Sequence, residues 1–242
     1  MSPALVAVAH GSRDPAATRA TEDLLGAVRR ARPDLDVVGA YLDHARPALD
    51  EALREVHGPA VVVPLLLGAA YHSRVDIPAA IAASGRLAVQ ADVLGPDPLL
   101  LDALERRLGE VGVRRGDPAT AVVLAAAGSS DPAAVADVRR LARGWADRGW
   151  WAVVPAFASA ADPSVQEAVA DLRRRGAPRV AVASYVLFPG LFADRLAAAG
   201  ADVTGPPLGA APELVSLLLA RYGAAAALVA PAPTAGTTLP RP

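Results

Sequence analysis

All four histidines of the chain lie in its first 72 residues, and two of them stand near points where an apolar run meets a turn. His10 follows one such run and opens the sequence HGSRDP, and His72 comes shortly after another. Asp43 and His44 directly follow a third run. Two imidazoles and a carboxylate suit a borderline divalent ion such as Co²⁺, Fe²⁺, Ni²⁺ or Zn²⁺. A neutral imidazole can also accept a proton near neutral pH. The pattern therefore indicates metal or proton chemistry, with Asp43 a better candidate than His44.

Each histidine by itself also fits an ordinary structural role. A histidine after a strand is more often a hydrogen-bonded loop residue than a ligand. His57, in EVHGPA, fits a cation at the C-terminal end of a helix, where the helix dipole favours positive charge and a glycine ends the helix. We therefore assign no function to His57.

The apolar runs alternate with longer Ala/Leu/Arg segments of helical periodicity, which predicts an α/β fold. The runs are continuously apolar, as in parallel strands covered on both faces, and strand–helix–strand spacing implies right-handed crossovers. With the common strand order 2-1-3, the carboxyl ends of the first three strands meet at one edge, with His10 opposite His72 and with Asp43 and His44 on the flank. The expected strands are residues 4–9, 36–42, 60–66 and 86–91, and the expected helices are 15–32, 47–57, 76–84 and 98–111.

The pattern then starts again, which predicts a tandem duplication. VAVAHGSRDPAA (6–17) returns as VLAAAGSSDPAA (123–134), AYLDHARPALDEAL (40–53) as AFASAADPSVQEAV (156–169), and VVVPLLLGAAYH (61–72) more weakly as VASYVLFPGLF (182–192). We expect two Rossmann-like or flavodoxin-like lobes, each a small parallel sheet flanked by helices, with the active-site cleft between them. The N-terminal lobe would span residues 1–115 and the C-terminal lobe 118–228, and the Pro/Thr-rich segment 229–242 is expected to be a disordered tail.

The repeat separates structural residues from functional ones. The glycine and the Asp-Pro pair of HGSRDP recur in GSSDP, as expected for a turn followed by a helix with Asp as N-cap and Pro at its first position. His10 is replaced by Ala127, and Arg13 by Ser130. We therefore interpret His10 and Arg13 as functional additions to the first lobe.

The composition excludes several classes of protein. A net charge of −1 gives no support for nucleic-acid or membrane partners, and no apolar run approaches the ~20 residues that span a bilayer. No secretory leader is recognised, so a cytoplasmic protein is expected. The absence of cysteine excludes disulfides, zinc fingers and cysteine-ligated iron–sulfur clusters. All 24 basic residues are Arg, so lysine-based mechanisms are excluded. Every basic side chain therefore ends in a planar guanidinium group, whose geometry suits carboxylates.

Three segments together resemble the sirohydrochlorin chelatases, the class II chelatases of cobalamin and siroheme synthesis. They are HGSRDP, PLLLGAAYHSRVDIP (64–78) and the GSSDP of the second lobe, and the resemblance covers about residues 4–222. It implies two α/β lobes around a cleft, with two histidines of the N-terminal lobe that bind the incoming metal and help to remove pyrrole protons. Those positions match His10 and His72. The family's acidic residue after the second strand, usually Glu, is matched by Asp43, one methylene shorter.

The resemblance thus predicts a lyase that inserts Co²⁺ or Fe²⁺, with Ni²⁺ also compatible, into sirohydrochlorin. It implies His10 and His72 as catalytic residues and, with Asp43, as metal ligands; no organic cofactor is expected, because the metal is a substrate. The substrate of this family has eight carboxylates, which arginine side chains at the mouth of the cleft could bind in a bidentate manner. LFPGLF (187–192) is a candidate apolar wall. The candidate substrate-binding residues are Ser12, Arg13, Arg46 and Arg74, with Arg195 as a weaker one. The duplicated chain is expected to be a monomer that forms a pseudo-dimer by itself.

Other functions compete with this interpretation. A histidine phosphatase usually shows Arg-His-Gly rather than His-Gly-Ser-Arg, and it leaves the repeat unexplained. A serine hydrolase would need G-x-S-x-G, which neither GSR nor GSS supplies. A non-catalytic two-lobed protein that binds metal or tetrapyrrole remains an alternative. The choice of metal, and with it the siroheme or cobalamin pathway, is left open.

Overall fold

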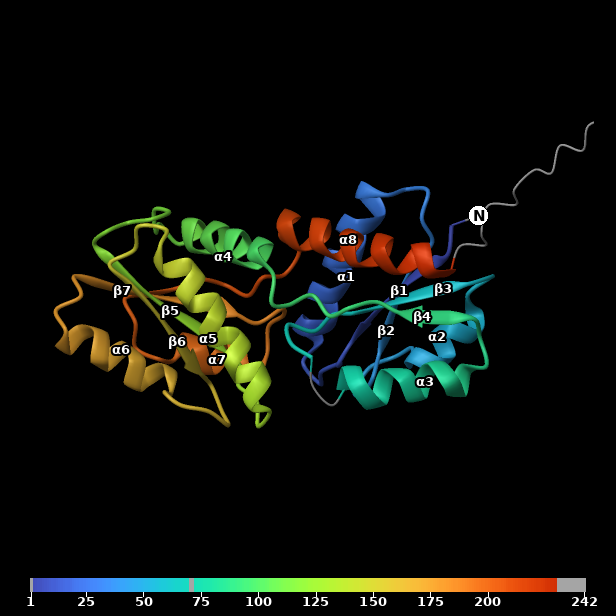
Figure 1. Cartoon of the computed structure of the whole chain (residues 1–242), viewed down its shortest axis with the longest axis horizontal. Coiled ribbons are helices and arrows are strands. Elements are labelled where there is room, and N and C mark those ends of the chain that lie inside the picture. The colour runs from blue at the N-terminus through green and yellow to red at the C-terminus, as the bar shows by residue number, and fades with distance from the viewer. Residues whose placement is uncertain (1, 70–71, 230–242) are drawn as a thin grey trace, which may run out of the picture.

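Each half of the chain folds as a four-stranded parallel sheet flanked by helices, in a computed structural model that describes residues 2–69 and 72–229 (Figure 1). The first sheet has the order β2-β1-β3-β4, so β1 lies between β2 and β3, as the sequence predicts. The elements of this half are β1 (Ala4–Ala9), α1 (Pro15–Ala31), β2 (Val37–Tyr41), α2 (Leu49–Glu55), β3 (Ala60–Pro64), the π-helical turn η1 (His72–Asp76), α3 (Ile77–Ser84), β4 (Ala88–Gln90) and α4 (Pro98–Glu110).

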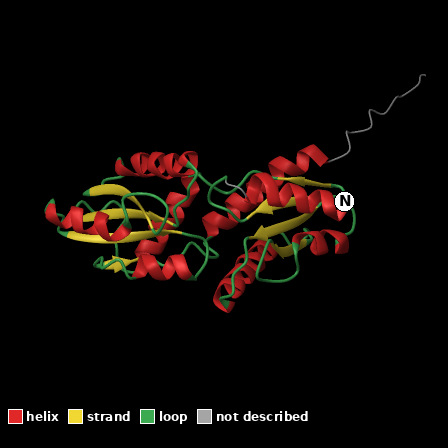
Figure 2. Cartoon of the chain, turned by 90° about the horizontal axis from the view of Figure 1, so that it is seen from below, coloured by secondary structure: helices red, strands yellow, loops and turns green. Residues whose placement is uncertain are grey.

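The second half repeats this topology with the order β6-β5-β7-β8. Figure 2 shows two separate groups of strands, each flanked by helices. Its elements are β5 (Thr120–Ala126), α5 (Pro132–Ala146), β6 (Ala152–Phe157), α6 (Val165–Arg174), β7 (Arg179–Tyr185), α7 (Leu191–Ala197), β8 (Val203–Thr204) and α8 (Pro212–Val229). The expected fold class, two tandem α/β lobes with parallel sheets, is confirmed. The predicted tail 229–242 lies, apart from its first residue, outside the described residues.

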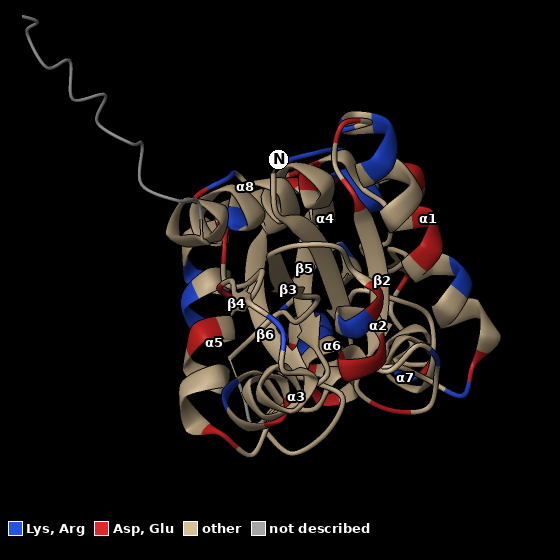
Figure 3. Cartoon of the chain, turned by 90° about the vertical axis from the view of Figure 1, so that its right-hand side faces the viewer, with Lys and Arg blue, Asp and Glu red and all other residues tan. Residues whose placement is uncertain are grey.

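The local sequence explains why these elements form where they do. Every residue of β1 and β5 is buried, so the continuous apolar runs are strands covered on both faces. Asp14 and Asp131 cap α1 and α5 by accepting hydrogen bonds from the backbone N–H groups of Ala16 and Ala133, at 2.8 and 2.9 Å. In the end-on view, charged residues lie mainly on the outer helices (Figure 3). The π-helical turn η1 is an element that periodicity did not predict, because five residues are too few to show a period.

The last helix of each half packs against the other half. Helix α4 contacts β7, and α8 returns across the molecule to contact β3, β4 and α1 (Figure 1). The predicted boundary at residues 116–117 falls in the loop between α4 and β5. This boundary separates the two sheets along the chain. The helices do not follow it, because α4 of the first half packs on the second sheet and α8 of the second half packs on the first sheet. The division into lobes at this boundary therefore stays a prediction.

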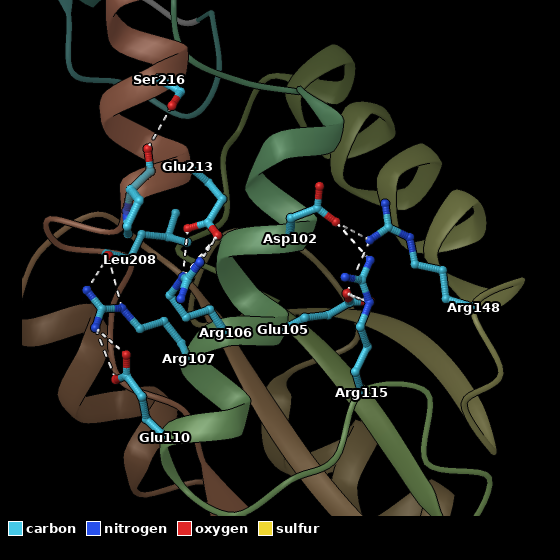
Figure 4. A network of polar contacts seen from close by, with 11 residues as sticks. Asp102, Glu105, Arg106, Arg107, Glu110, Arg115, Arg148, Leu208, Glu213 and Ser216 are labelled. Atoms are coloured by element: carbon cyan, nitrogen blue, oxygen red, sulfur yellow. Dashed lines mark hydrogen bonds and ion pairs between the residues drawn. The ribbon is translucent and has the colours of Figure 1, made fainter. Parts of the chain in front are cut away.

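A buried polar network fastens α4 to the C-terminal half (Figure 4). The Glu105 carboxylate, 5% exposed, accepts a hydrogen bond from the Trp145 indole N–H at 2.7 Å and pairs with Arg148 at 3.3 Å. Arg148 also donates to Asp102 at 2.6 Å. On the other side of α4, Arg106 forms a forked pair with Glu213 of α8. These bonds hold the exchanged helices in place and thereby set the position of one lobe relative to the other.

Helix α8 is long and apolar enough, by length and composition alone, to cross a membrane. Six of its side chains are buried inside the protein, and Arg221 in the same helix donates hydrogen bonds to the carbonyls of Val93 and Leu94. Through these contacts one face of α8 packs against the rest of the protein.

Candidate active site

The sheet topology brings His10 and His72 together, as predicted. His10 directly follows the last residue of β1, and His72 opens η1, beyond the end of the neighbouring β3. Their ring centroids lie 4.5 Å apart, with the ring planes inclined by 39°. The ring of His44 lies farther from His10, at 6.2 Å. The two imidazoles are thus held against one another, in a tilted arrangement, at the carboxyl edge of the first sheet.

A close backbone approach sets the position of the loop that carries Asp43. The N–H of Asp43 donates to the carbonyl of His10 at 2.9 Å, and a Cβ placed on Gly11 would lie only 1.7 Å from the carbonyl oxygen of Asp43. Gly11 also has a φ of +94°, which L side chains rarely adopt. Gly128 repeats this geometry in the second lobe against Ser159. The glycine is therefore a structural requirement of both repeats.

The Asp43 carboxylate is directed at His44. It accepts a hydrogen bond from the backbone N–H of His44 at 2.7 Å and lies 3.3 Å from the Nδ1 atom of that residue. His44 has a φ of 61°, and Ala160, its counterpart in the repeat, has a φ of 57°. The left-handed backbone at His44 hence belongs to the loop shape that both lobes share. The structure places Asp43 beside the histidine pair, and its role as a metal ligand stays a prediction.

A cavity of about 470 Å³ opens between the two lobes beside His10. Residues that are related by the repeat line this cavity from the two lobes. The pairs are Ala9 and Ala126, Thr21 and Val138, and Tyr41 and Phe157. The first lobe contributes His10, Thr18 and Thr21 to the lining, whereas most of the second lobe's lining is apolar, with Ser129 and Tyr185 as its polar side chains. Residues 186–193, which include the predicted LFPGLF wall, line one side of the cavity.

A second, smaller cavity lies on the other side of the histidine pair. It has a volume of about 390 Å³ and is lined by His10, His72 and three carboxylate-bearing residues, Asp43, Asp50 and Asp76. His10 lines both cavities and therefore stands at their boundary. Within residues 2–69 and 72–229, no group of three or more His, Asp or Glu side chains is close enough to hold a metal ion. In this conformation the two imidazoles pack against one another instead.

The electrostatics of the pair differ between its two members. Partial burial, the neighbouring His72 and then His44 lower the pKa of His10, and the more distant carboxylates of Asp43 and Asp76 oppose that shift. This shift favours the neutral ring of His10, and a neutral imidazole can bind a metal ion or accept a proton. The Nδ1 atom of His72 lies 2.6 Å from Oδ2 of Asp76, one turn along the same chain segment.

Of the predicted substrate-binding residues, Ser12 lines the large cavity and the arginines do not. The Oγ of Ser12 accepts a hydrogen bond from the N–H of Asp14, a turn-shaping bond that Ser129 repeats in the second lobe. Arg13 and Arg74 are exposed, and no Arg is among the described residues that line the large cavity.

Three of the predicted arginines have partners within the protein. Arg74 reaches across to Asp131 of the second lobe at 3.4 Å. Arg46 pairs with Glu51, and Arg195 lies over the ring of Phe192, 6.0 Å from its centroid. Contacts of these arginines with a substrate stay predictions.

Sequence reasoning missed Asp76 as a partner of His72. The signal was present, because the two residues stand four apart in HSRVD, and side chains at that spacing lie on the same side of a helical turn. It also missed the polar wall formed by Thr18, Thr21 and Tyr41. Those residues come from two different elements, and no spacing along the chain indicates that they share a cavity.

These features define a class of protein: a duplicated α/β fold with a histidine pair at the edge of an interlobe cavity. The chain belongs to the CbiX family, that of the sirohydrochlorin chelatases, whose family model matches residues 4–111 and 121–225. Each match covers one of the two repeats.

Individual relatives agree with this assignment. A sirohydrochlorin cobaltochelatase of Priestia megaterium is 29% identical over 205 residues, which are 78% of this chain and 65% of the relative. The chain thus spans a little less than two thirds of that protein. A sirohydrochlorin ferrochelatase of the same organism is 29% identical over 206 residues, 80% of this chain and 76% of the relative. The solved structure of SirB from Bacillus subtilis with Fe³⁺ has the same fold, with a TM-score of 0.77 at 24% identity over 95% of this chain and 97% of that one.

Proposed function

We propose that this protein is a sirohydrochlorin chelatase, a lyase that inserts Co²⁺ or Fe²⁺ into sirohydrochlorin for cobalamin or siroheme synthesis. The observation that carries the proposal is the pair of His10 and His72, with ring centroids 4.5 Å apart, at the edge of an apolar interlobe cavity. The names of the two Priestia megaterium relatives, one a cobaltochelatase and one a ferrochelatase, support the reaction and leave the metal open.

The reaction exchanges protons for metal. A divalent ion loses bound water and forms bonds to the ring nitrogens, and the macrocycle releases its two pyrrole N–H protons. His10 borders the cavity that would take the macrocycle, where its neutral ring could accept a pyrrole proton. His72 would hold the ion beside it, and Asp43 would support the ion from the flank. Histidine ligands bind such ions only when neutral, so metal binding and proton acceptance compete for the same lone pairs.

The substrate's carboxylates would extend from the apolar cavity to its rim. Arg forks bind carboxylates in a bidentate manner, and Arg13 and Arg74 are exposed beside the two motif histidines. Ser12 and Arg46 are further candidate contacts. We propose a cytoplasmic monomer whose two lobes enclose the substrate, with no organic cofactor and no nucleic-acid or membrane partner.

The decisive experiment mixes the purified protein with sirohydrochlorin and Co²⁺ or Fe²⁺ and follows the visible spectrum of the macrocycle. An enzyme accelerates the spectral change above the rate without protein. The variants His10→Ala and His72→Ala should each lose most of this activity while keeping the wild-type circular dichroism spectrum, and Asp43→Ala should lose less.

His57→Ala is the matched control, because it removes the same side chain from an exposed site after α2, away from the carboxyl edge of the sheet. It should retain wild-type activity. If wild-type protein bound both ligands and left the rate at background, the protein would be a binding protein and the proposed activity would be wrong. Full activity of both His10→Ala and His72→Ala would remove these residues from the mechanism.

A further inference from the structure

The two histidines of the site differ in what supports them. The Nδ1 atom of His72 lies 2.6 Å from Oδ2 of Asp76, within hydrogen-bond distance. Both residues belong to the π-helical turn η1, which places side chains four residues apart on one side of the turn. Among the described residues, no carboxylate makes a corresponding hydrogen bond to the ring of His10, and the carboxylate of Asp43 is directed at His44 instead. The pair is thus asymmetric.

Asp76 stands at a helix start but does not cap the helix. The aspartates that begin α1, α4 and α5, namely Asp14, Asp97 and Asp131, each accept a hydrogen bond from a backbone N–H of the first turn. Asp76 precedes α3 too, but it has helical backbone angles, with φ −68° and ψ −44°, because η1 runs directly into α3. Its side chain makes no capping hydrogen bond and lies against His72 instead.

The contact also contributes little to stability. The side chains of His72 and Asp76 are 42% and 37% exposed, and ion pairs at such exposure are worth about 0–1 kcal/mol. Stability therefore does not explain why the carboxylate is held there. A carboxylate on one ring nitrogen, in contrast, fixes the tautomer and the ring orientation of a histidine and makes its other nitrogen a stronger ligand.

The two histidines also differ in which cavity they line. His72 and Asp76 line only the smaller cavity, whereas His10 lines both. The supported histidine is hence on the side away from the apolar cavity, and His10 stands between it and that cavity.

We propose that Asp76 is a positioning residue of this site: its carboxylate accepts the Nδ1–H of His72 and so keeps the lone pair of that ring on Nε2, for the metal ion. His72 then acts as the anchoring ligand on the side of the smaller cavity, and His10 acts as the ligand that meets the macrocycle. The inference rests on the proposed function for the identity of the reaction. It predicts a defined tautomer of His72 whether or not the reaction occurs.

Two substitutions separate positioning from charge. Asp76→Ala removes the acceptor and should raise the KM for Co²⁺ by about 10–100-fold, the cost of losing such a partner of a metal-binding histidine, with a smaller change in kcat. Asp76→Asn keeps an oxygen that can accept the Nδ1–H and should restore much of the loss. Asp50→Asn removes a carboxylate from the same cavity, where Asp50 pairs with Arg54 rather than with a histidine. It should change the KM for Co²⁺ by much less than Asp76→Ala does.

The tautomer can be observed directly in the metal-free protein. The ¹⁵N shifts of the neutral His72 ring should show the proton on Nδ1 in the wild-type protein and in Asp76→Asn, and a mixture of tautomers in Asp76→Ala. An unchanged tautomer and an unchanged KM for Co²⁺ in Asp76→Ala would overturn the inference, as would equal losses in Asp50→Asn and Asp76→Ala. A defined Nδ1–H tautomer in a wild-type protein that inserts no metal would instead refute the proposed function and leave the His72–Asp76 arrangement standing.

Discussion

The contact between Gly11 and the Asp43 loop allows a quantitative test of how the site is held. In Gly11→Ala the new Cβ would lie 1.7 Å from the carbonyl oxygen of Asp43, and the residue would keep a φ of +94° only under strain. A left-handed conformation costs an L residue about 1–2 kcal/mol, and displacement of a packed neighbour adds about 1–3 kcal/mol. We therefore expect a loss of about 2–5 kcal/mol in the free energy of unfolding. At roughly 2–4 °C per kcal/mol for a chain of this size, Tm should fall by about 4–20 °C.

The second lobe supplies the matched control. Gly128 has a φ of +92°, and its added Cβ would lie 1.8 Å from the carbonyl oxygen of Ser159, so Gly128→Ala should destabilise the protein by a similar amount. Only Gly11→Ala displaces the loop that carries Asp43 and abuts His10. In assays below both melting temperatures, Gly11→Ala should therefore lose about 10-fold or more in chelation rate, since a shift of about 1 Å at a reacting group can cost 100-fold.

Two results would contradict this reasoning. Urea or thermal melts in which either variant loses less than about 1 kcal/mol, the size of an ordinary point substitution, would show that the close approach does not constrain the loop. Equal losses of activity in the two variants would show that stability alone, rather than the position of the Asp43 loop, limits the reaction.

The remaining predictions concern charge and packing. In NMR titrations, the ring of His10 should have a pKa below its ordinary value of 6.5, because burial and the neighbouring His72 and His44 disfavour the imidazolium. As the pH falls, the unfolded chain therefore takes up this proton before the folded protein does. The contribution of His10 to the free energy of unfolding is then lost as the pH falls through 6.5. His72→Gln should raise the pKa of His10, and an unchanged midpoint would argue against their coupling. Asp131→Asn keeps an acceptor for the α5 cap but frees Arg74, and should lower the KM for sirohydrochlorin; a higher KM would mean that the Asp131 carboxylate itself serves the substrate. Glu105→Ala removes the buried partner of Trp145 and Arg148 and should cost about 3–5 kcal/mol in urea melts, and a loss below about 1 kcal/mol would show that the network does not hold α4.

The sequence by itself determined the parallel α/β fold, the duplication and the pairing of His10 with His72. Continuous apolar runs have few alternatives to doubly covered strands, and parallel strands bring their carboxyl ends to one edge whatever the details of the loops. The comparison of the two repeats separated Gly11, which both lobes need, from His10, which only one lobe has.

Only the tertiary structure decided which groups surround the pair. The exchange of α4 and α8 between lobes depends on packing between elements far apart in the chain. The direction of the Asp43 carboxylate toward His44, and of the Asp76 carboxylate toward His72, depends on backbone angles and side-chain rotamers that residue types alone do not specify. The cavity walls are likewise shared between segments more than a hundred residues apart, such as Tyr41 and Phe157. Local patterns select the elements, and the three-dimensional meeting of their ends produces the site.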